Sequence, residues 1–186
     1  MKNSRAIASL MISSVLALTI PVFINPHKAD ASDYSENLCR RTVVGTYLAT
    51  ASQTNSTSGQ PSSYREIITF TADGNLIAND SNAGGVPGSS NPNDQPFGVV
   101  QGSWKCTENN KIVAKALNFS FPSGSLAGNI VLTEYQLTFN PQTGTVNGSG
   151  KFNFFNLNKS PLDQKTQPLP IPPFKFSYQG VKLKAD

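Results

Sequence analysis

Apolar side chains alternate with polar ones along the segment "NIVLTEYQLTFN" at residues 129–140. Val131, Thr133, Tyr135, Leu137 and Phe139 occupy every second position, and this period places them on one face of a β-strand, which we expect to point inward. Comparable short segments, bounded by Gly, Pro, Asn, Asp and Ser, recur from residue 40 onward, and none has the period of an amphipathic helix. The sequence therefore predicts an all-β fold.

The turns between these segments suit an antiparallel meander. Asp73-Gly74-Asn75 is the strongest turn signal, because glycine permits positive φ, and it predicts a hairpin between residues 63–72 and 75–80. We predict a single antiparallel up-and-down β-barrel of seven to eight strands, whose closure leaves no exposed edge. The expected strands are residues 41–52, 63–72, 75–80, 97–108, 111–121, 129–140, 145–156 and 174–186.

Residues 111–121 carry a second apolar row. Val113, Leu117, Phe119 and Phe121 share a face that we also expect to point inward. Lys115 interrupts this row and, if it faces inward, needs an acidic partner or a polar cavity.

Two other segments have little to bury. Residues 81–96 are mostly Gly, Ser, Asn and Pro, and we interpret them as a flexible loop at the rim of the barrel, a passive insertion being the alternative. The prolines of residues 160–173 cannot donate sheet hydrogen bonds, so we expect a connection that crosses the barrel end. A docking peptide for another protein is the alternative.

The segments "RTVVGTYLAT" at residues 41–50 and "FGVVQGSWKC" at residues 97–106 form a weak internal repeat. Each combines two valines, a glycine, a small hydroxyl residue and an aromatic residue. A strand glycine lets neighbouring backbones approach or bend, and the aromatic side chain can then plug the closed end of a barrel. The alternative is that Tyr47 or Trp104 lines a ligand site.

The N-terminus has the order of a secretory signal peptide. Lys2 and Arg5 precede a long apolar run, and Ala29-Asp30-Ala31 forms an A-x-A cleavage site. A membrane anchor is the alternative, although Ser, Thr and Pro interrupt the run. We predict a cleaved leader at residues 1–31, a secreted or periplasmic protein, and one barrel domain at residues 32–186 with no transmembrane segment.

Removal of this leader constrains the chemistry. His27 is the only histidine, so the mature chain has none, which excludes histidine-dependent triads, general bases and zinc sites and disfavours an enzyme. Cys39 and Cys106 are then expected to form one disulfide. After removal of the leader the chain has 12 basic and 10 acidic residues, and its longest run of basic residues is Arg40-Arg41. This charge distribution argues against a nucleic-acid partner. The oligomeric state is not predicted.

The repeated motif carries a resemblance to a known group. Gly45-Thr46-Tyr47 resembles the G-x-W signature of a lipocalin first strand, and Gly102-Ser103-Trp104 matches that signature more closely in a later segment. With the short leader and the disulfide-poor meander over residues 40–184, these motifs make the chain similar to the lipocalin and calycin group of secreted barrels. The resemblance implies an exported barrel that holds a small apolar ligand, with residues 81–96 at its mouth.

The barrel interior could be hollow or filled. Phe152 and Phe154 alternate inward with Gly148 and Gly150, which predicts bulk at one end of the strand and open space at the other. A packed interior, and hence a purely structural secreted domain, is the alternative. Asp80 and Asp94 are better explained as turn formers than as calcium ligands, so no metal site and no cofactor is predicted. The candidate ligand-binding residues are Tyr47, Tyr64, Phe70, Trp104, Phe119, Tyr135, Phe152 and Phe154.

Glu66 is the one candidate catalytic residue. It shares a strand face with Tyr64, Ile68 and Phe70, and burial of an inward Glu66 would raise its pKa, as a general acid or base requires. Such a site would suit a barrel isomerase or cyclase acting on an apolar substrate, similar in architecture to allene oxide cyclases. The sequence favours the opposite facing, with Arg65, Ile67 and Thr69 inward and Glu66 in solvent. The facing of residue 66 therefore discriminates between the hypotheses.

Overall fold

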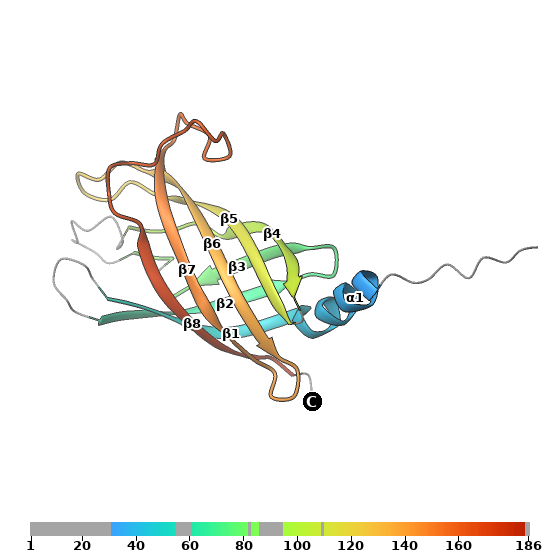
Figure 1. Ribbon diagram of the computed structural model, residues 1–186. Coiled ribbons are helices and arrows are strands. Elements are labelled where there is room, and N and C mark those ends of the chain that lie inside the picture. Colours follow the sequence, from blue (N-terminus) through green and yellow to red (C-terminus); the bar gives the residue numbers. More distant parts are fainter. Residues whose placement is uncertain (1–30, 55–60, 82, 86–94, 109, 185–186) are drawn as a thin grey trace, which may run out of the picture.

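The computed structural model describes residues 31–54, 61–81, 83–85, 95–108 and 110–184. Eight antiparallel strands form a closed barrel in which every strand pairs with its neighbours in sequence and β8 pairs with β1 (Figure 1). This confirms the predicted all-β, up-and-down architecture. The elements are α1 (Ala31–Val43), β1 (Gly45–Thr54), β2 (Pro61–Phe70), β3 (Asn75–Asp80), β4 (Val100–Glu108), β5 (Lys111–Ser120), β6 (Asn129–Asn140), β7 (Thr145–Asn156) and β8 (Phe174–Lys182).

The first expected strand begins later than predicted. Residues 41–43 belong to α1, and β1 starts at Gly45, whose φ of 144° favours glycine. The helix lies at one end of the barrel (Figure 1). The Tyr47 hydroxyl donates a hydrogen bond to the carbonyl oxygen of Val43 at 2.9 Å and so ties the end of α1 to the barrel interior.

Four aromatic side chains fill the end of the barrel that α1 covers. Phe70 makes edge-to-face contacts with Tyr47, Trp104 and Phe139, at ring-centroid distances of 5.9, 6.0 and 5.5 Å. All four rings are buried. Two of them are the aromatic residues of the repeated Gly-x-aromatic motif, so the structural interpretation of the repeat is confirmed: each aromatic plugs the closed end.

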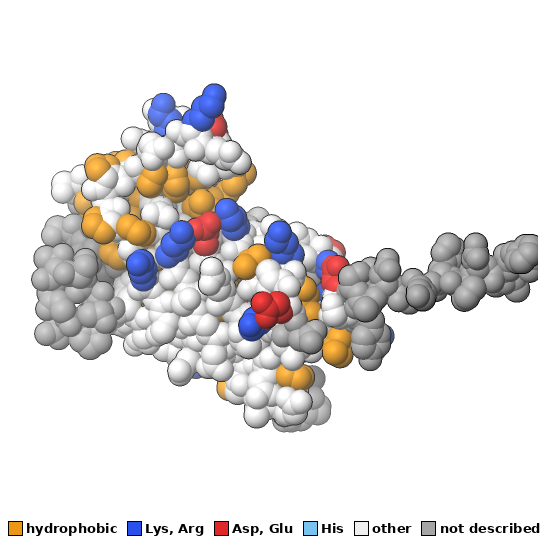
Figure 2. Space-filling model, viewed as in Figure 1, with side chains coloured by type: hydrophobic (Ala, Val, Ile, Leu, Met, Phe, Trp, Pro, Cys, Tyr) orange, Lys and Arg blue, Asp and Glu red, His pale blue; other side chains and the backbone are white. Residues whose placement is uncertain are grey.

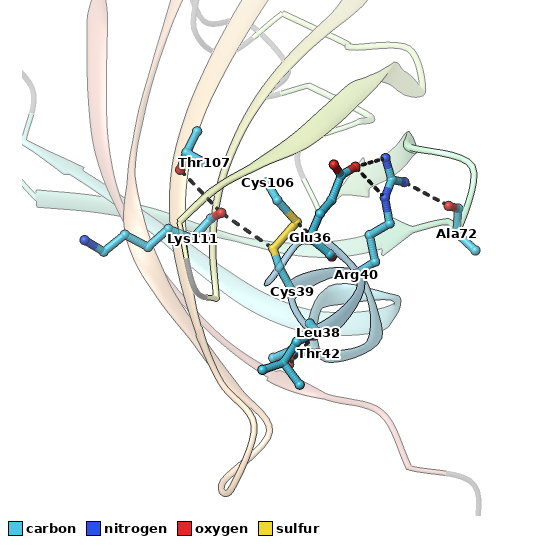
Figure 3. The surroundings of a disulfide bond; sticks show 9 residues. All are labelled: Glu36, Leu38, Cys39, Arg40, Thr42, Ala72, Cys106, Thr107 and Lys111. Carbon is cyan, nitrogen blue, oxygen red and sulfur yellow. Dashed lines mark hydrogen bonds and ion pairs between the residues drawn. A yellow bond between two sulfur atoms is a disulfide. The ribbon is translucent and has the colours of Figure 1, made fainter. Parts of the chain in front are cut away.

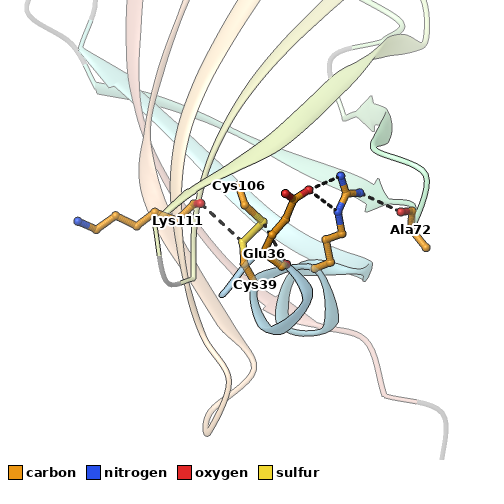
Figure 4. Close-up of polar contacts among 6 residues, drawn as sticks. Glu36, Cys39, Ala72, Cys106 and Lys111 are labelled. Atoms are coloured by element: carbon orange, nitrogen blue, oxygen red, sulfur yellow. Dashed lines mark hydrogen bonds and ion pairs between the residues drawn. A yellow bond between two sulfur atoms is a disulfide. The ribbon is translucent and has the colours of Figure 1, made fainter. Parts of the chain in front are cut away.

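A disulfide joins Cys39 on α1 to Cys106 on β4, as predicted, with an S–S distance of 2.04 Å (Figure 3). The sulfur of Cys39 lies 3.8 Å from the carbonyl oxygen of Lys111. Beside it, the Arg40 guanidinium binds Glu36 and donates to the carbonyl oxygen of Ala72 at 3.0 Å (Figure 4). The same guanidinium lies 5.5 Å from the centre of the Trp104 ring, a cation–π distance. These contacts hold α1 against the closed end.

The facing of β6 was predicted correctly, and that of β5 was not. Val131, Thr133 and Tyr135 are buried in the interior. On β5, however, Phe119 is 54% exposed, and the inward residues include Ala114, Ala116 and Asn118 instead.

The reason is that both faces of β5 are apolar, so alternation alone cannot choose between them. Small inward alanines leave room for the interior aromatic rings. The larger outward side chains pair across the sheet surface, Phe119 opposite Ile130 and Leu117 opposite Leu132.

The glycines of β7 do not leave open space, contrary to the prediction. A Cβ at Gly150 would lie 2.2 Å from the Phe176 ring, and one at Gly148 would lie 2.1 Å from the carbonyl oxygen of Gln136. These positions are therefore already filled, because the Phe176 ring of β8 covers Gly150 and residues 136–137 of β6 lie against Gly148. The open space lies toward the other end of β7, beyond Phe152.

The outer face carries charge and apolar side chains in separate zones. Glu134 faces outward and binds Lys115 at 3.0 Å and Lys151 at 2.9 Å. Lys175 on β8 lies directly opposite Lys151 on β7, so lysines dominate a row across β5–β8 (Figure 2). Above this row lies an apolar area (Figure 2), and Phe119, Phe121, Leu157 and Leu162 are among the exposed large hydrophobic residues.

The described ends of residues 81–96 and the connection at residues 160–173 lie at the end opposite α1. Most of residues 81–96 fall outside the described residues, but their ends meet, because the Phe97 amide donates to the carbonyl oxygen of Ala83 at 3.1 Å. Residues 160–173 connect β7 to β8, and the Leu169 amide donates to the carbonyl oxygen of Phe154 at 2.8 Å.

Residues 1–30, and hence nearly all of the predicted leader, lie outside the described residues. In the part of the chain that the structure describes, no helix has the length and apolar character needed to cross a membrane.

Candidate functional site

A cavity of about 50 Å³ lies in the half of the barrel opposite α1. It has space for roughly three water molecules, because each needs about 15 Å³. Strands β1 to β7 all contribute to its wall, and Phe97 joins them from the segment before β4. The lining residues are Gln53, Tyr64, Glu66, Asp80, Phe97, Val100, Asn118, Val131, Thr133, Tyr135 and Phe152.

Glu66 points into this cavity. Its side chain is 3% exposed, whereas the neighbouring Ile67 is 54% exposed on the outer surface. The expectation that Glu66 lies in solvent is therefore wrong. Strand β2 faces inward with Tyr64, Glu66, Ile68 and Phe70, and burying the two large residues beyond Glu66 forces the carboxylate into the interior as well.

Burial dominates the electrostatics of Glu66. Burial raises the pKa of this carboxyl from 4.5 to about 7, with a smaller upward contribution from the charge of Asp80. The neighbouring hydroxyls of Tyr178 and Tyr135 limit this rise, and the Tyr135 hydroxyl donates a hydrogen bond to Glu66 Oε1 at 3.2 Å. Glu66 therefore changes protonation near neutral pH.

The tyrosines around Glu66 stay protonated. Burial, together with the charge of Glu66, raises the pKa of Tyr64, Tyr135 and Tyr178 above the ordinary value. Each hydroxyl can therefore act as a hydrogen-bond donor over the whole physiological pH range. The carboxylate sits in a ring of neutral donors, and Asp80, its cross-strand partner on β3, is the other acidic group of the cavity wall.

Three oxygen atoms on the cavity wall are buried without a hydrogen bond. They are Glu66 Oε2, Gln53 Oε1 and Asn118 Oδ1. The Asn118 amide is oriented by its nitrogen, which donates to the carbonyl oxygen of Gly98 at 3.3 Å, so its oxygen is left facing the cavity. Buried polar groups in folded proteins almost always have partners, so these three acceptors are available to donors such as water or a bound molecule.

The remaining wall is apolar and partly aromatic. Phe97, Val100, Val131 and Phe152 line the cavity. Phe152 stacks on Phe174 with ring centroids 5.0 Å apart, which extends the apolar surface toward the end of the barrel opposite α1. The cavity wall thus combines buried polar groups with an apolar and partly aromatic surface.

The structure separates the predicted ligand-binding residues into three groups. Tyr64, Tyr135 and Phe152 line the cavity, as does Glu66, and Phe154 packs against Phe152 at 5.8 Å. Tyr47, Phe70 and Trp104 do not line it, because they fill the closed end under α1.

Phe119 lies on the outer face, so its prediction as a ligand-binding residue is wrong. Four lining residues were not among the predicted binding residues: Gln53, Asp80, Phe97 and Asn118. Their shared signal is position, since each lies within a few residues of the strand ends at the rim.

Among the described residues, no group of three or more His, Cys, Asp and Glu side chains is placed to hold a metal ion. Asp94, which we interpreted as a turn former, lies outside those residues. No protein-family model, curated protein or solved structure matches the chain. A closed barrel alone does not establish a family, so the lipocalin resemblance stays a prediction.

Proposed function

We propose that this protein is an exported binding module that holds a small, mainly apolar ligand in the open half of its barrel. The observation that carries the proposal is the cavity beside Glu66, where buried acceptors without partners face an apolar and aromatic wall. Ligand pockets combine these features: hydrophobic walls give affinity, and a few placed polar groups fix orientation. The closed end, filled by aromatic rings and sealed by α1, supplies a rigid base.

The disulfide supports the proposal of export, because such bonds persist in oxidising compartments. N-terminal sequencing of the protein from its source tests this point directly. We expect a mature chain that begins at Ser32; a protein that retains residues 1–31 contradicts the predicted leader.

Native mass spectrometry of protein purified from its source tests the binding function. We expect a non-covalent mass increment that disappears on denaturation. The matched control is Val131→Phe, which fills the cavity from β6 and should remove the increment. A protein that never carries a guest, and that Val131→Phe stabilises, would instead have a structural barrel with an imperfectly filled core.

The second candidate function is an acid–base isomerase or cyclase. The specific observation in its favour is that Glu66 lies in the cavity beside Tyr64 and Tyr135 with a pKa near 7, which suits a general acid or base. In such a site Glu66 would move a proton while the barrel excludes water from an apolar substrate.

Glu66→Gln distinguishes catalysis from binding. General acid–base assistance contributes about 10² to 10⁴ in rate, so the variant should retain unreacted substrate that the wild-type protein converts. Both proteins would be incubated with an extract of the source, and their bound molecules compared by mass spectrometry and chromatography. Recovery of the same molecule from the wild-type protein and from Glu66→Gln would contradict catalysis and support a binding function only.

A further inference from the structure

We propose that the ligand of the open half of the barrel carries a protonated amine, which binds against Glu66 with its apolar chain directed toward the open end. This inference rests on the proposed binding function and names the chemical class of the ligand. It is carried by three independent properties of the cavity: the type of its unpaired polar atoms, the sign of its charge and the aromatic character of its wall.

The unpaired polar atoms of the cavity wall are acceptors. Glu66 Oε2, Gln53 Oε1 and Asn118 Oδ1 have no donor, whereas no buried nitrogen or hydroxyl of the described lining residues is left without a partner. The Tyr178 hydroxyl, which is near Glu66 but does not line the cavity, is an unpaired donor close to them. A ligand that satisfies these oxygens must therefore donate hydrogen bonds. An ammonium group has three donors and no acceptor, which matches three acceptor oxygens better than a hydroxyl, with one donor, can.

The charge of the cavity also favours a cation. Glu66 and Asp80 are both on its wall, and no lysine or arginine is among the described lining residues. The charges of the two carboxylates oppose each other, because Asp80 raises the pKa of Glu66. A bound cation relieves this repulsion, whereas a fatty-acid carboxylate would add a further negative charge. The cavity is thus unsuited to the acyl-type ligands that its apolar wall alone would admit.

Aromatic faces supply the third property. Tyr64, Phe97, Tyr135 and Phe152 surround the cavity, and aromatic rings attract desolvated cations through their negative faces. The volume of about 50 Å³ accommodates an ammonium group and the first carbons of a chain. The rest of the chain would lie along Phe152 and Phe174 toward the open end.

Binding of an amine should be coupled to ionisation of Glu66. The titratable groups around Glu66 are Tyr64 on β2, Asp80 on β3, Tyr135 on β6 and Tyr178 on β8. The three tyrosines remain neutral up to alkaline pH, so Glu66 is the group that changes charge between pH 5 and 8. Affinity for an amine should therefore rise with pH across this range.

The test uses three ligands of similar shape: n-hexylamine, 1-hexanol and hexanoate. Titration calorimetry at pH 8 should give at least tenfold tighter binding of n-hexylamine than of 1-hexanol, with hexanoate the weakest. Between pH 8 and pH 5.5 the amine should lose about tenfold in affinity, while 1-hexanol changes little. Glu66→Gln should remove the preference for the amine and leave 1-hexanol binding nearly unchanged. Glu134→Gln, on the outer face, is the matched control and should behave as wild type.

The outcomes separate the two proposals. Equal or tighter binding of 1-hexanol or hexanoate overturns the amine inference and leaves the binding function standing. Failure of all three ligands to bind a protein that is folded by circular dichroism overturns the binding function, and the inference with it. An amine preference that persists in folded Glu66→Gln also overturns the inference, because the carboxylate would not be its cause.

Discussion

The buried carboxylate of Glu66 makes the stability of this protein depend on pH in an unusual direction. Its pKa is about 7 in the folded chain and ordinarily 4.5, so between these values the folded state binds the proton that the unfolded state has lost. The contribution of Glu66 to the free energy of unfolding is therefore fully present below pH 4.5 and is lost as the pH rises to about 7. Because one pKa unit corresponds to about 1.4 kcal/mol, the loss between pH 5 and pH 8 is roughly 2.5 kcal/mol.

Urea unfolding of the chain from Ser32 to Asp186 at pH 5 and pH 8 measures this loss. The chain without its first 31 residues contains no histidine, so few other groups titrate in the interval. With a slope of about 1–3 kcal/mol per molar urea, the unfolding midpoint should be about 0.8–2.5 M lower at pH 8. In Glu66→Gln this difference should vanish, and the variant should exceed wild type at pH 8.

Glu134→Gln is the control for removal of a carboxylate. Lys151 and Lys115 hold the pKa of Glu134 below its ordinary value, so the contribution of Glu134 to stability is lost only at acidic pH. Glu134→Gln should therefore show the same difference in unfolding midpoint between pH 5 and pH 8 as the wild-type protein. A wild-type protein equally stable at both pH values, or a difference that persists unchanged in Glu66→Gln, would refute the assignment of a proton-binding, buried Glu66.

Three further substitutions test the fold. Replacing both cysteines of the bridge by serine should lower stability by up to about 4 kcal/mol in urea unfolding, because the bridge closes a loop between residues 67 apart in sequence; an unchanged midpoint would contradict this. Lys175→Glu should stabilise the protein by about 0.2–1 kcal/mol at low salt by relieving repulsion from Lys151, and a gain that high salt does not diminish would exclude charge as its cause. Gly148→Ala should cost about 1–3 kcal/mol in thermal unfolding, since its Cβ meets the Gln136 carbonyl oxygen; a neutral effect would show that the strands can move apart.

The strand order could be predicted from sequence because it depends on local signals. Alternation, the Asp73-Gly74 turn and the Pro-rich connection each concern neighbouring residues, and together they specify an up-and-down meander. The position of α1 could not be predicted in this way. Few of its residues are apolar, and a short helix of this kind depends on the disulfide and on Arg40 packing over Trp104 at the barrel end.

The candidate site was predictable only in part, because facing is decided by distant partners. Residues on β2 and β5 are apolar on both faces, so neither Glu66 nor Phe119 could be assigned by alternation. Glu66 is held by Tyr135, which lies 69 residues away in sequence. The aromatic residues Tyr64, Tyr135 and Phe152 were identified because large rings on inward faces are visible in the sequence. The polar lining residues Gln53 and Asn118 were missed because they resemble ordinary rim residues.

Carbon-13 NMR of the glutamate carboxyl groups, with and without n-hexylamine, tests the central claim most directly. The chain after residue 31 contains four glutamates, and Glu66→Gln identifies the resonance of interest. We expect Glu66 to titrate with a pKa of about 7 in the free protein and with a clearly lower pKa when the amine is bound. A Glu66 that titrates near its ordinary pKa, or whose titration the amine leaves unchanged, would contradict a binding site centred on this carboxylate.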